Sequence, residues 1–502
     1  YFLSGVIMIG RKKEIQILES LCSETSSKLI VVEGRRRIGK TYLVDYMFKE
    51  HKNDCLYFDC AGAYDKDNKT QLKNLLNSIY IWFKKEPTHP IADWTDLFFF
   101  LWNTIQEEIK EKQHNGKVVM FIDEVPWIDP DDNNGFLSAL GYFWNQYCLK
   151  ESNFILILCG SNSSWVTNKI LKDKNGSLHK RVDKVISLKP FTLLETKEYL
   201  VKEKRYESDD MTILDAYMVF GGVAKYLSFL DKNKSIYENI DEIFFSLSGQ
   251  LYDEYETLFY TLFGDKNGMH KKIMDALASK KSGLTKKELA AKIKTQTTDS
   301  RVGKTLDELE LCGFINGLTK FGNQNRDIKY IIADNYCLFY KKWLEHLNKN
   351  DIARLSNYWS NQINTQSYNS WAGFAFELIC INNIDLYLEK RGLKELFKSV
   401  NYWQYQPKDE HDKGAQIDLL IEYKNNMYEI VECKFYDAEY TITKEYVQNL
   451  ANKKAKFIEH GIKTKRYDIR MSMLTSFGVA ENAHFKNANI VANIKLCDML
   501  DM

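Results

Sequence analysis

The sequence predicts an α/β protein whose N-terminal part is built on a parallel sheet and whose C-terminal part is a second, smaller α/β fold. Two observations support this fold class. Three short apolar runs in the first 187 residues have the length and composition of buried strands: Leu29–Glu33, Val118–Ile122 and Phe154–Cys159. Near the other end, two further runs flank a short polar loop at residues 424–426, which is the pattern of a β-hairpin. Helical patterns fill most of the sequence between them.

The first run leads directly into a glycine-containing loop, and a helical pattern follows from Tyr42 to Lys49. The loop and the residues that end it read Gly34, Arg35, Arg36, Arg37, Ile38, Gly39, Lys40 and Thr41. A strand, such a loop and a helix in this order can cradle the phosphates of ATP with backbone N–H groups. We expect Lys40 to reach the β- and γ-phosphates, Thr41 to bind Mg²⁺ and at least one loop arginine to face another domain.

The second run ends in two adjacent carboxylates, Asp123 and Glu124. Two acids at the end of a buried strand are costly unless they have partners. We expect Asp123 to belong to the Mg²⁺ shell and Glu124 to act as the base that activates the attacking water.

Two further residues are candidates for sensing the γ-phosphate. The third run ends in Gly160-Ser161-Asn162, so Asn162 or Ser161 can lie beside the phosphates; an ordinary polar turn explains the pattern equally well. Arg181 is a candidate arginine finger, supplied in cis or by a neighbouring copy, although a lone arginine is more often solvated or salt-bridged.

The middle of the chain reads as helices. Phe191–Lys202 and Asp210–Phe220 precede Gly221-Gly222, as expected of a helical lid. Three helical patterns and a strand-like Tyr330–Ala333 follow in the order of a winged helix. Its cations Lys292, Lys294, Arg301 and Lys304 can meet DNA phosphates, but the same fold can contact proteins, and the interspersed acids leave both options open.

The C-terminal hairpin carries a second set of chemical groups. Asp418 lies on its first strand, and Glu432 and Lys434 alternate on the second, so the two project to one face. We expect Asp418 and Glu432 to hold a divalent metal ion, Lys434 to activate water and the helical Glu377 to join them. The alternatives are ordinary surface charges or an inactive relic that keeps the fold.

The composition places few further limits on function. There are 69 Lys and Arg residues against 68 Asp and Glu residues, so the chain carries no global electrostatic footprint for nucleic acid. Ten scattered cysteines without metal-site spacing fit reduced thiols, and no apolar stretch approaches the ~18 residues that cross a membrane. We therefore expect a cytoplasmic protein with no membrane partner.

These motifs resemble the prokaryotic AAA-type ATPases of the archaeal type, close to the signal-transducing ATPases with numerous domains. The likeness runs the full length and rests on Gly34–Thr41, Phe121–Trp127, Cys159–Ser161 and Gly414–Ile421. It implies a P-loop ATPase core at 1–187, a helical lid at 188–264, a winged helix at 265–350 and a PD-(D/E)XK nuclease-like domain of unknown function at 351–502. It also carries the roles given above onto Lys40, Thr41, Asp123, Glu124, Arg181, Asp418, Glu432 and Lys434.

The sequence thus predicts an ATPase that uses ATP and Mg²⁺ and whose nucleotide state rearranges a winged helix and a nuclease-like domain on or near DNA. The alternative is a non-catalytic nucleotide switch that binds regulatory partner proteins. An oligomer is compatible with both.

Overall fold

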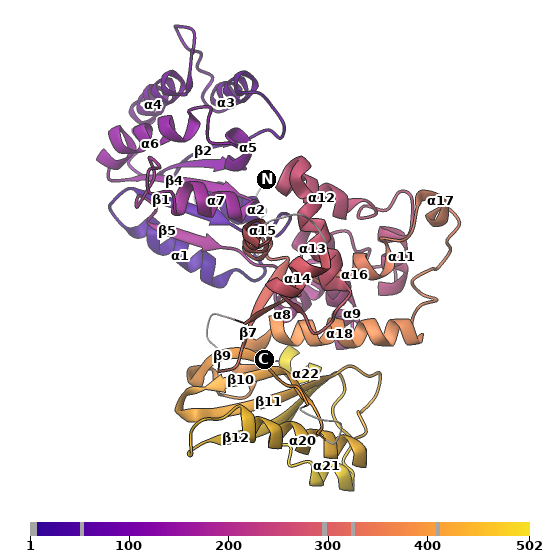
Figure 1. The fold of residues 1–502 in the computed structure, drawn as a ribbon. Helices are drawn as coiled ribbons and strands as arrows, with labels where there is room; N and C mark the ends of the chain where they lie inside the picture. The colour runs from indigo at the N-terminus through magenta and orange to yellow at the C-terminus, as the bar shows by residue number, and fades with distance from the viewer. Residues whose placement is uncertain (1–7, 51–54, 294–298, 323–326, 408–411, 502) are drawn as a thin grey trace. The chain divides into compact units, whose positions relative to one another are not determined.

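The computed structural model describes residues 8–50, 55–293, 299–322, 327–407 and 412–501. The chain forms two compact units, each described here by itself. Unit 1 ends at Pro190 and unit 2 begins at Phe191. Figure 1 shows unit 1 in indigo to magenta and unit 2 from magenta through orange to yellow.

Unit 1 is built on a five-stranded parallel sheet in the order β2-β3-β4-β1-β5. The strands are β1 (Lys28–Glu33), β2 (Leu56–Ala61), β3 (Val118–Asp123), β4 (Phe154–Gly160) and β5 (Lys184–Ser187). The inner strands read as continuous apolar runs because helices cover both faces of the sheet (Figure 1). Every residue of β4 is buried, as this arrangement requires.

The helices of unit 1 divide between the two faces of that sheet. They are α1 (Lys12–Ser23), α2 (Lys40–Asp45), α3 (Asn68–Phe83), α4 (Trp94–Glu111), α5 (Val125–Ile128), α6 (Phe136–Gln146) and α7 (Ser163–Val166). Figure 1 shows α3, α4 and α6 on one face and α1 on the other. Phe98 of α4 stacks on Phe143 of α6 with ring centroids 5.0 Å apart, inside one large apolar core. That core fixes the sheet whose carboxyl edge carries the loop residues.

Unit 2 contains one eight-stranded mixed sheet in the order β13-β12-β11-β10-β9-β7-β8-β6. The strands are β6 (Leu284–Thr285), β7 (Ile315–Lys320), β8 (Ile328–Ile332), β9 (Phe397–Tyr405), β10 (Ala415–Tyr423), β11 (Met427–Lys434), β12 (Asp468–Thr475) and β13 (Ala492–Lys495). β7 pairs in parallel with β9 through Thr319–Asn401 and Lys320–Tyr402. The sheet therefore joins strands that are far apart in the sequence (Figure 1).

The helices of unit 2 come in three groups along the chain. Residues 191–263 form α8 (Leu193–Glu198), α9 (Asp210–Phe220), α10 (Ala224–Leu227), α11 (Ile236–Phe244) and α12 (Glu254–Phe263). A segment at 268–332, called the helix–hairpin segment below, contains α13 (Gly268–Ala278), α14 (Lys286–Ile293), α15 (Asp299–Leu311) and strands β6–β8. The remaining helices are α16 (Asn335–Trp343), α17 (Lys349–Ile352), α18 (Gln366–Asn382), α19 (Ile384–Lys390), α20 (Lys444–His460), α21 (Ala483–Asn487) and α22 (Leu496–Leu500).

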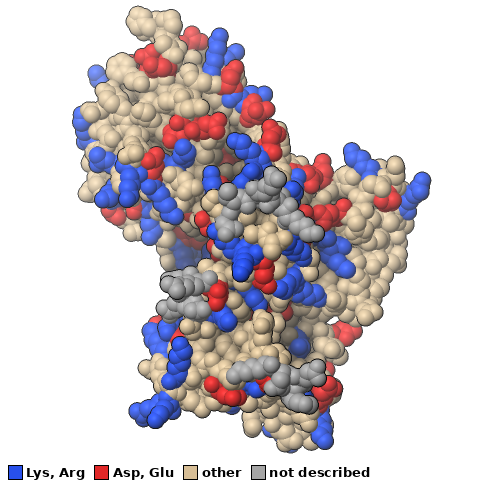
Figure 2. All heavy atoms as spheres, in the orientation of Figure 1, with Lys and Arg blue, Asp and Glu red and all other residues tan. Residues whose placement is uncertain are grey.

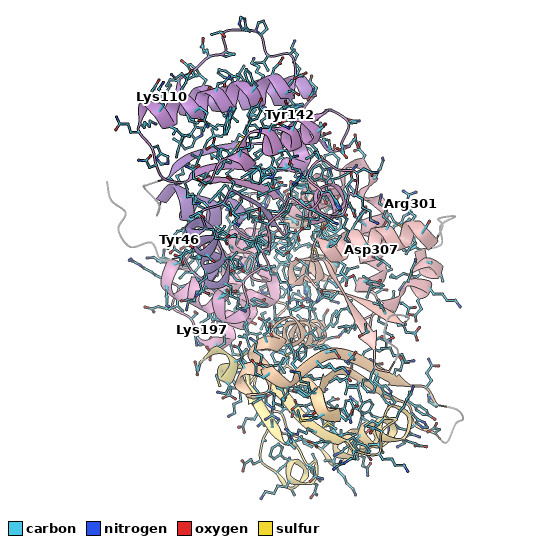
Figure 3. The ribbon with its side chains drawn as sticks, turned by 90° about the vertical axis from the view of Figure 1, so that its left-hand side faces the viewer. Tyr46, Lys110, Tyr142, Lys197, Arg301 and Asp307 are labelled. Carbon is cyan, nitrogen blue, oxygen red and sulfur yellow. The ribbon has the colours of Figure 1, made fainter. Side chains whose placement is uncertain are left out.

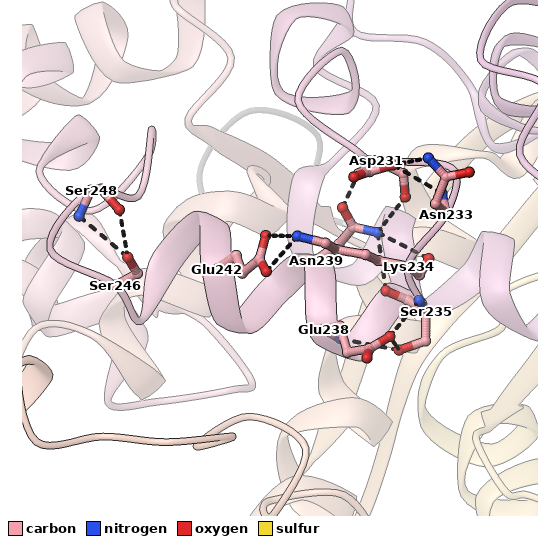
Figure 4. A network of polar contacts seen from close by, with 9 residues as sticks. All are labelled: Asp231, Asn233, Lys234, Ser235, Glu238, Asn239, Glu242, Ser246 and Ser248. Carbon is pink, nitrogen blue, oxygen red and sulfur yellow. Dashed lines mark hydrogen bonds and ion pairs between the residues drawn. The ribbon is translucent and has the colours of Figure 1, made fainter.

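Local sequence sets where these helices begin, as α11 illustrates (Figure 4). The backbone N–H of Glu238 donates to the Ser235 hydroxyl, and the Glu238 carboxylate accepts from the Ser235 N–H at 2.8 Å, which is a capping box. The Asn239 amide then donates to the carbonyls of Asp231, Lys234 and Ser235. The turn before α11 is thus held by side chains from the helix itself.

Helices from residues 191–263 pack directly on the C-terminal part of unit 2. Asp215 of α9 accepts a hydrogen bond from the Tyr368 phenol of α18 at 3.3 Å. Lys197 of α8 lies beside α22 and donates to Asp501 at 3.2 Å (Figure 3). The predicted fold class is confirmed: a parallel-sheet core is followed by a C-terminal mixed α/β sheet. The four-part division at 187, 264 and 350 stays a prediction.

Candidate functional site

The loop after β1 has a backbone that only glycine can follow at its first residue. Gly34 has φ +142°, and a Cβ there would lie 2.2 Å from the carbonyl oxygen of Leu188. That contact is fixed because the Leu188 N–H donates to the Glu33 carbonyl at 2.8 Å. Gly39, at φ +93°, directly precedes α2. The first N–H groups of a helix are therefore presented at the end of the loop, where an anion binds.

Lys40 lies inside the curve of this loop. The residue is 6% exposed, and its ammonium donates to the carbonyls of Gly34 at 2.9 Å and Arg35 at 3.1 Å. A phosphate bound in the loop would replace these carbonyls as the hydrogen-bond acceptor of the Lys40 ammonium. The Arg36 guanidinium lies over the Trp127 ring, 5.7 Å from its centroid, in the same unit.

The remaining loop residues have distinct surroundings. Ile38 is buried in the core, Arg35 is buried, and Arg37 has a left-handed φ of 72°. Whether a loop arginine faces another domain stays a prediction.

The acids after β3 lie beside the loop, as the sequence predicts. The Thr41 hydroxyl donates to Asp123 at 2.6 Å, so the two residues expected to hold Mg²⁺ are adjacent. Glu124 has a left-handed φ of 47°, and its carboxylate accepts from both the N–H and the hydroxyl of Ser161. Burial raises the pKa of Glu124, while the nearby charge of Lys40 lowers it. A carboxylate with a raised pKa suits a general base.

Asn162 and Arg181 occupy different parts of unit 1. The Asn162 side chain caps α7 by accepting from the Trp165 N–H at 3.0 Å, at the carboxyl edge of the sheet. Arg181 is exposed and precedes β5. Next to it, Asp183 bonds Leu29 at the start of β1, the edge opposite the loop. The structure therefore brings Asn162 to the loop edge and leaves Arg181 away from it.

Arg11 is a residue near the loop that sequence reasoning did not single out. It is 4% exposed, has a left-handed φ of 60°, and donates from its guanidinium to the Ile38 carbonyl at 3.1 Å. A Gly-Arg pair is not a sequence motif, so the sequence alone gives no signal for Arg11. Only its burial against the loop, 27 residues further along the chain, marks it as part of the site.

A second group of acids converges in unit 2. β10 and β11 pair in antiparallel register through Leu420–Ile430 and Ile421–Glu429, and continuing this register places Asp418 opposite Glu432. Burial, followed by the charges of Asp418 and Glu432, raises the pKa of Glu377 on α18 to about 7. The structure thus brings together the three carboxylates that the sequence suggested.

The Glu432 carboxylate is bound by residues of α20. Its two oxygens accept from Lys453 at 2.5 Å and from the Tyr446 phenol at 2.8 Å. The Lys434 ammonium lies 4.0 Å from Glu432, and 5.2 Å from the centroid of the Tyr446 ring. Lys453 was not anticipated, because its position 19 residues beyond Lys434 gives no signal in the sequence.

The contacts of Asp418 and Glu432 bear on whether these carboxylates can bind a divalent cation. In the described parts of the chain, no three His, Cys, Asp or Glu side chains already form a metal-binding group. Lys453 holds Glu432, and the Gln416 amide donates to Asp418. The donor chemistry nevertheless fits a hard cation, since carboxylate oxygens are its preferred ligands and the raised pKa of Glu377 shows that negative charge is crowded here.

The helix–hairpin segment presents the cations that were considered for DNA. Lys292, Arg301 and Lys304 are exposed, whereas Lys294 falls outside the described residues. Figure 2 shows Lys and Arg side chains gathered over the area where Figure 1 draws α13 to α15, and Figure 3 shows Arg301 at the outer side of α15. Acids lie among them, as in the Lys304–Glu308 pair at 3.9 Å.

The fold and the two sites define a class: a P-loop ATPase core followed by a restriction-endonuclease-like fold. Residues 8–230 match the family described as an ATPase domain predominantly from Archaea. Residues 390–502 match a family described as a restriction endonuclease. The chain carries an archaeal-type ATPase domain and a C-terminal restriction-endonuclease-like domain.

Two curated relatives come from Methanocaldococcus jannaschii. The uncharacterized protein MJECL04 is 27% identical over 223 residues, which are 44% of this chain and 43% of that protein. The chain therefore spans less than half the length of this relative. The uncharacterized ATP-binding protein MJ0423 is 39% identical over 49 residues, which are 10% of this chain and 83% of that protein.

Similar solved structures include a Walker-type ATPase and an ORC2 protein. A Walker-type ATPase of Pyrococcus abyssi has a TM-score of 0.46 at 17% identity, over 67% of this chain and 96% of its own. The ORC2 protein of Aeropyrum pernix has a TM-score of 0.44 at 13% identity, over 75% of this chain and 96% of its own. Within the described residues, no helix has both the length and the apolar character needed to span a bilayer.

Proposed function

We propose that this chain hydrolyses ATP with Mg²⁺ and that its nucleotide cycle controls a metal-dependent nuclease site acting on DNA. The observation that carries the proposal is the convergence of Lys40, Thr41, Asp123 and Glu124 at one edge of the parallel sheet. Because a nucleotide site and a set of clustered acids occur in one chain, we infer that ATP hydrolysis is coupled to DNA cleavage.

In unit 1, each residue has a role that its position supports. Lys40 binds the β- and γ-phosphates, and Thr41 and Asp123 hold the Mg²⁺ that neutralises developing charge on the phosphates. Glu124 accepts the proton of the attacking water, and Ser161 fixes the orientation of its carboxylate. Asn162 senses the γ-phosphate from the neighbouring strand end. Arg181 acts on the site of a neighbouring copy in an oligomer.

In unit 2, Asp418 and Glu432 hold a divalent cation with Glu377 as a further ligand. Such a cation polarises a phosphodiester and lowers the pKa of bound water. Lys434 orients that water and stabilises charge on the phosphoryl oxygens. Lys453 must leave Glu432 before a cation binds, so this contact separates a resting from an active arrangement.

The helix–hairpin segment is a winged helix in this proposal. Lys292, Arg301 and Lys304 bind DNA phosphates, which makes the interaction salt-sensitive and largely independent of sequence. The setting is the cytoplasm, where DNA and ATP are both present.

A second function is favoured by one observation. Both oxygens of Glu432 are already satisfied by Lys453 and Tyr446, which is a stable arrangement without metal. Such an arrangement is expected of a nucleotide-dependent switch that binds regulatory proteins, because its C-terminal fold serves as a binding surface and needs no metal ion at Glu432.

The experiment measures ATP hydrolysis and cleavage of plasmid and linear DNA with Mg²⁺ or Mn²⁺. We expect Glu124→Gln to lower ATP turnover by about 100-fold or more, because general base catalysis alone supplies that much. Lys40→Ala should lower it as well, because the charge that binds the β- and γ-phosphates is removed. Asp418→Ala and Glu432→Ala should abolish cleavage. Lys12→Ala and Asp385→Ala, exposed charges in the same units, serve as controls.

The outcomes separate the two functions. Cleavage lost in Asp418→Ala, Glu432→Ala and Lys40→Ala establishes an ATP-coupled nuclease. No cleavage by the wild type with either metal, together with intact ATP binding, supports the switch instead. Normal ATP turnover by Lys40→Ala contradicts the nucleotide half of the proposal.

A further inference from the structure

A cleft of about 990 Å³ in unit 2 opens beside the clustered carboxylates. One wall comes from α9 and α11, and the other from α18 and the segment after β11. Lys281, Phe374 and Glu377 line this cleft and also a small pocket that reaches Asp418. Glu377 therefore lines both hollows, and Asp418 lines the smaller one.

Two aromatic rings are exposed where the cleft meets the ends of neighbouring strands. Tyr436 follows β11 and is 51% exposed, and Phe477 follows β12 and is 38% exposed. The Tyr436 N–H donates to the Ser476 hydroxyl at 2.9 Å, and the Ser476 N–H donates to the Lys434 carbonyl at 3.3 Å. The backbone segments that carry the two rings are therefore tied together just beyond Lys434, and the Tyr436 ring packs edge-on against Tyr440 with centroids 5.0 Å apart.

Charge is distributed unevenly along the cleft. Lys281 and Lys434 line the cleft together with Glu377, and the Lys281 ammonium is positioned by the Ser370 carbonyl at 2.6 Å. Asp437 lies beside Tyr436 at the ring end. Phosphates are favoured at the lysine end, and uncharged planar groups are favoured at the ring end.

Two further acids of the cleft have structural roles. Asp209 caps α9 by accepting from the Thr212 N–H at 2.7 Å. Asp215 accepts from the phenols of Tyr237 and Tyr368. These two acids have partners within the fold, whereas Glu377 and Asp437 line the cleft together with the lysines and the rings.

We propose that this cleft binds a short single-stranded segment of nucleic acid, with bases stacked on Tyr436 and Phe477 and phosphates directed to Lys281 and Lys434. Bases stack on exposed aromatic side chains only when they are free of a duplex. The volume is at the upper end of the roughly 300–1,000 Å³ of small-ligand sites, which suits a few nucleotides and excludes a double helix.

The inference rests on the proposed nuclease site and names its substrate class. A single strand that enters at the rings and runs toward Lys281 passes Glu377 and Asp418. The scissile phosphate then lies at the carboxylates, and the neighbouring bases are fixed by stacking.

The test measures binding of fluorescein-labelled oligonucleotides of about 12 nucleotides to the full chain by anisotropy, in EDTA so that no cleavage occurs. Single-stranded DNA, single-stranded RNA and the matching DNA duplex are compared. We expect single strands to bind more tightly than the duplex. Tyr436→Ala and Phe477→Ala should each weaken single-strand binding by about tenfold. Tyr467→Ala, at 43% exposure elsewhere in unit 2, should leave it unchanged.

A cation variant adds a second readout that does not depend on the rings. Lys281→Ala should reduce the dependence of single-strand binding on salt, while Lys287→Ala on α14 should not. Circular dichroism of each variant shows that loss of binding is not loss of fold. The ratio of DNA to RNA affinity identifies which single strand the cleft prefers.

Different experimental results would contradict single-strand binding in the cleft and nuclease activity. Single-strand binding that is unchanged in both ring variants, or duplex binding that falls as much as single-strand binding in these variants, overturns the inference even if the chain cleaves DNA. Ring-dependent single-strand binding without cleavage in any metal supports the inference and removes the nuclease activity.

Discussion

At the residue scale, the nucleotide site depends most on Gly34. Its φ of +142° is unfavourable for any other residue, and a Cβ would lie 2.2 Å from the Leu188 carbonyl oxygen. We predict that Gly34→Ala abolishes ATP binding, measured by calorimetry, because the loop must shift to remove this clash. Gly39→Ala is the matched comparison: its φ is also positive, but nothing lies within 4 Å of its Cβ. It should retain measurable binding, and equal loss in both variants would contradict the steric explanation.

At the element scale, Asp215 links α9 to α18, the helix that carries Glu377. Burial raises the pKa of Asp215 to about 6 from the ordinary 3.8. The folded state therefore holds this proton more tightly than the unfolded chain, so its stability falls as the pH rises from about 4 to about 6 and then levels off. The loss is at most about 3 kcal/mol.

Asp215→Asn should remove this pH dependence, because the amide cannot ionise. The measurement is the unfolding midpoint in urea between pH 4 and pH 7, expressed as the difference from the wild type. Asp253→Asn, an exposed carboxylate on the same unit, should keep the wild-type profile. The same slope in Asp215→Asn and in the wild type would show that another group causes the effect.

At the scale of the whole molecule, unit 2 is held together by one sheet. The helix–hairpin segment contributes β7 to the edge of β9, and α18 supplies Glu377 to a site otherwise built on β10 and β11. A fragment of residues 390–502, where the restriction-endonuclease family match lies, lacks α18 and β7. Its apolar faces would be uncovered.

We predict that residues 191–502 unfold cooperatively on heating, whereas residues 390–502 show no cooperative transition. Circular dichroism and differential scanning calorimetry of both fragments provide the measurement. A fragment of 351–502, which restores α18 but not β7, should be intermediate. A fully cooperative transition for 390–502 would mean that the C-terminal fold does not need its neighbours.

The sequence by itself determined the loop residues, the acids at the end of β3 and the hairpin that carries Asp418 and Glu432. These features are local: glycine spacing, an apolar run that ends in carboxylates and a two-residue alternation are each set by neighbouring residues. The same signals predicted β1, β3 and β4 to within one residue at each end, because buried strands are apolar, but they gave no indication of β2 or β5.

Only the tertiary structure decided which distant groups meet. The contacts of Glu432 with Lys453, of Arg11 with the Ile38 carbonyl, and of β7 with β9 join residues that are 21 or more positions apart. The position of Arg181 at the edge opposite the loop was likewise invisible, because it depends on where β5 begins beside β1. Such contacts arise from packing and strand register, which a periodic pattern does not encode.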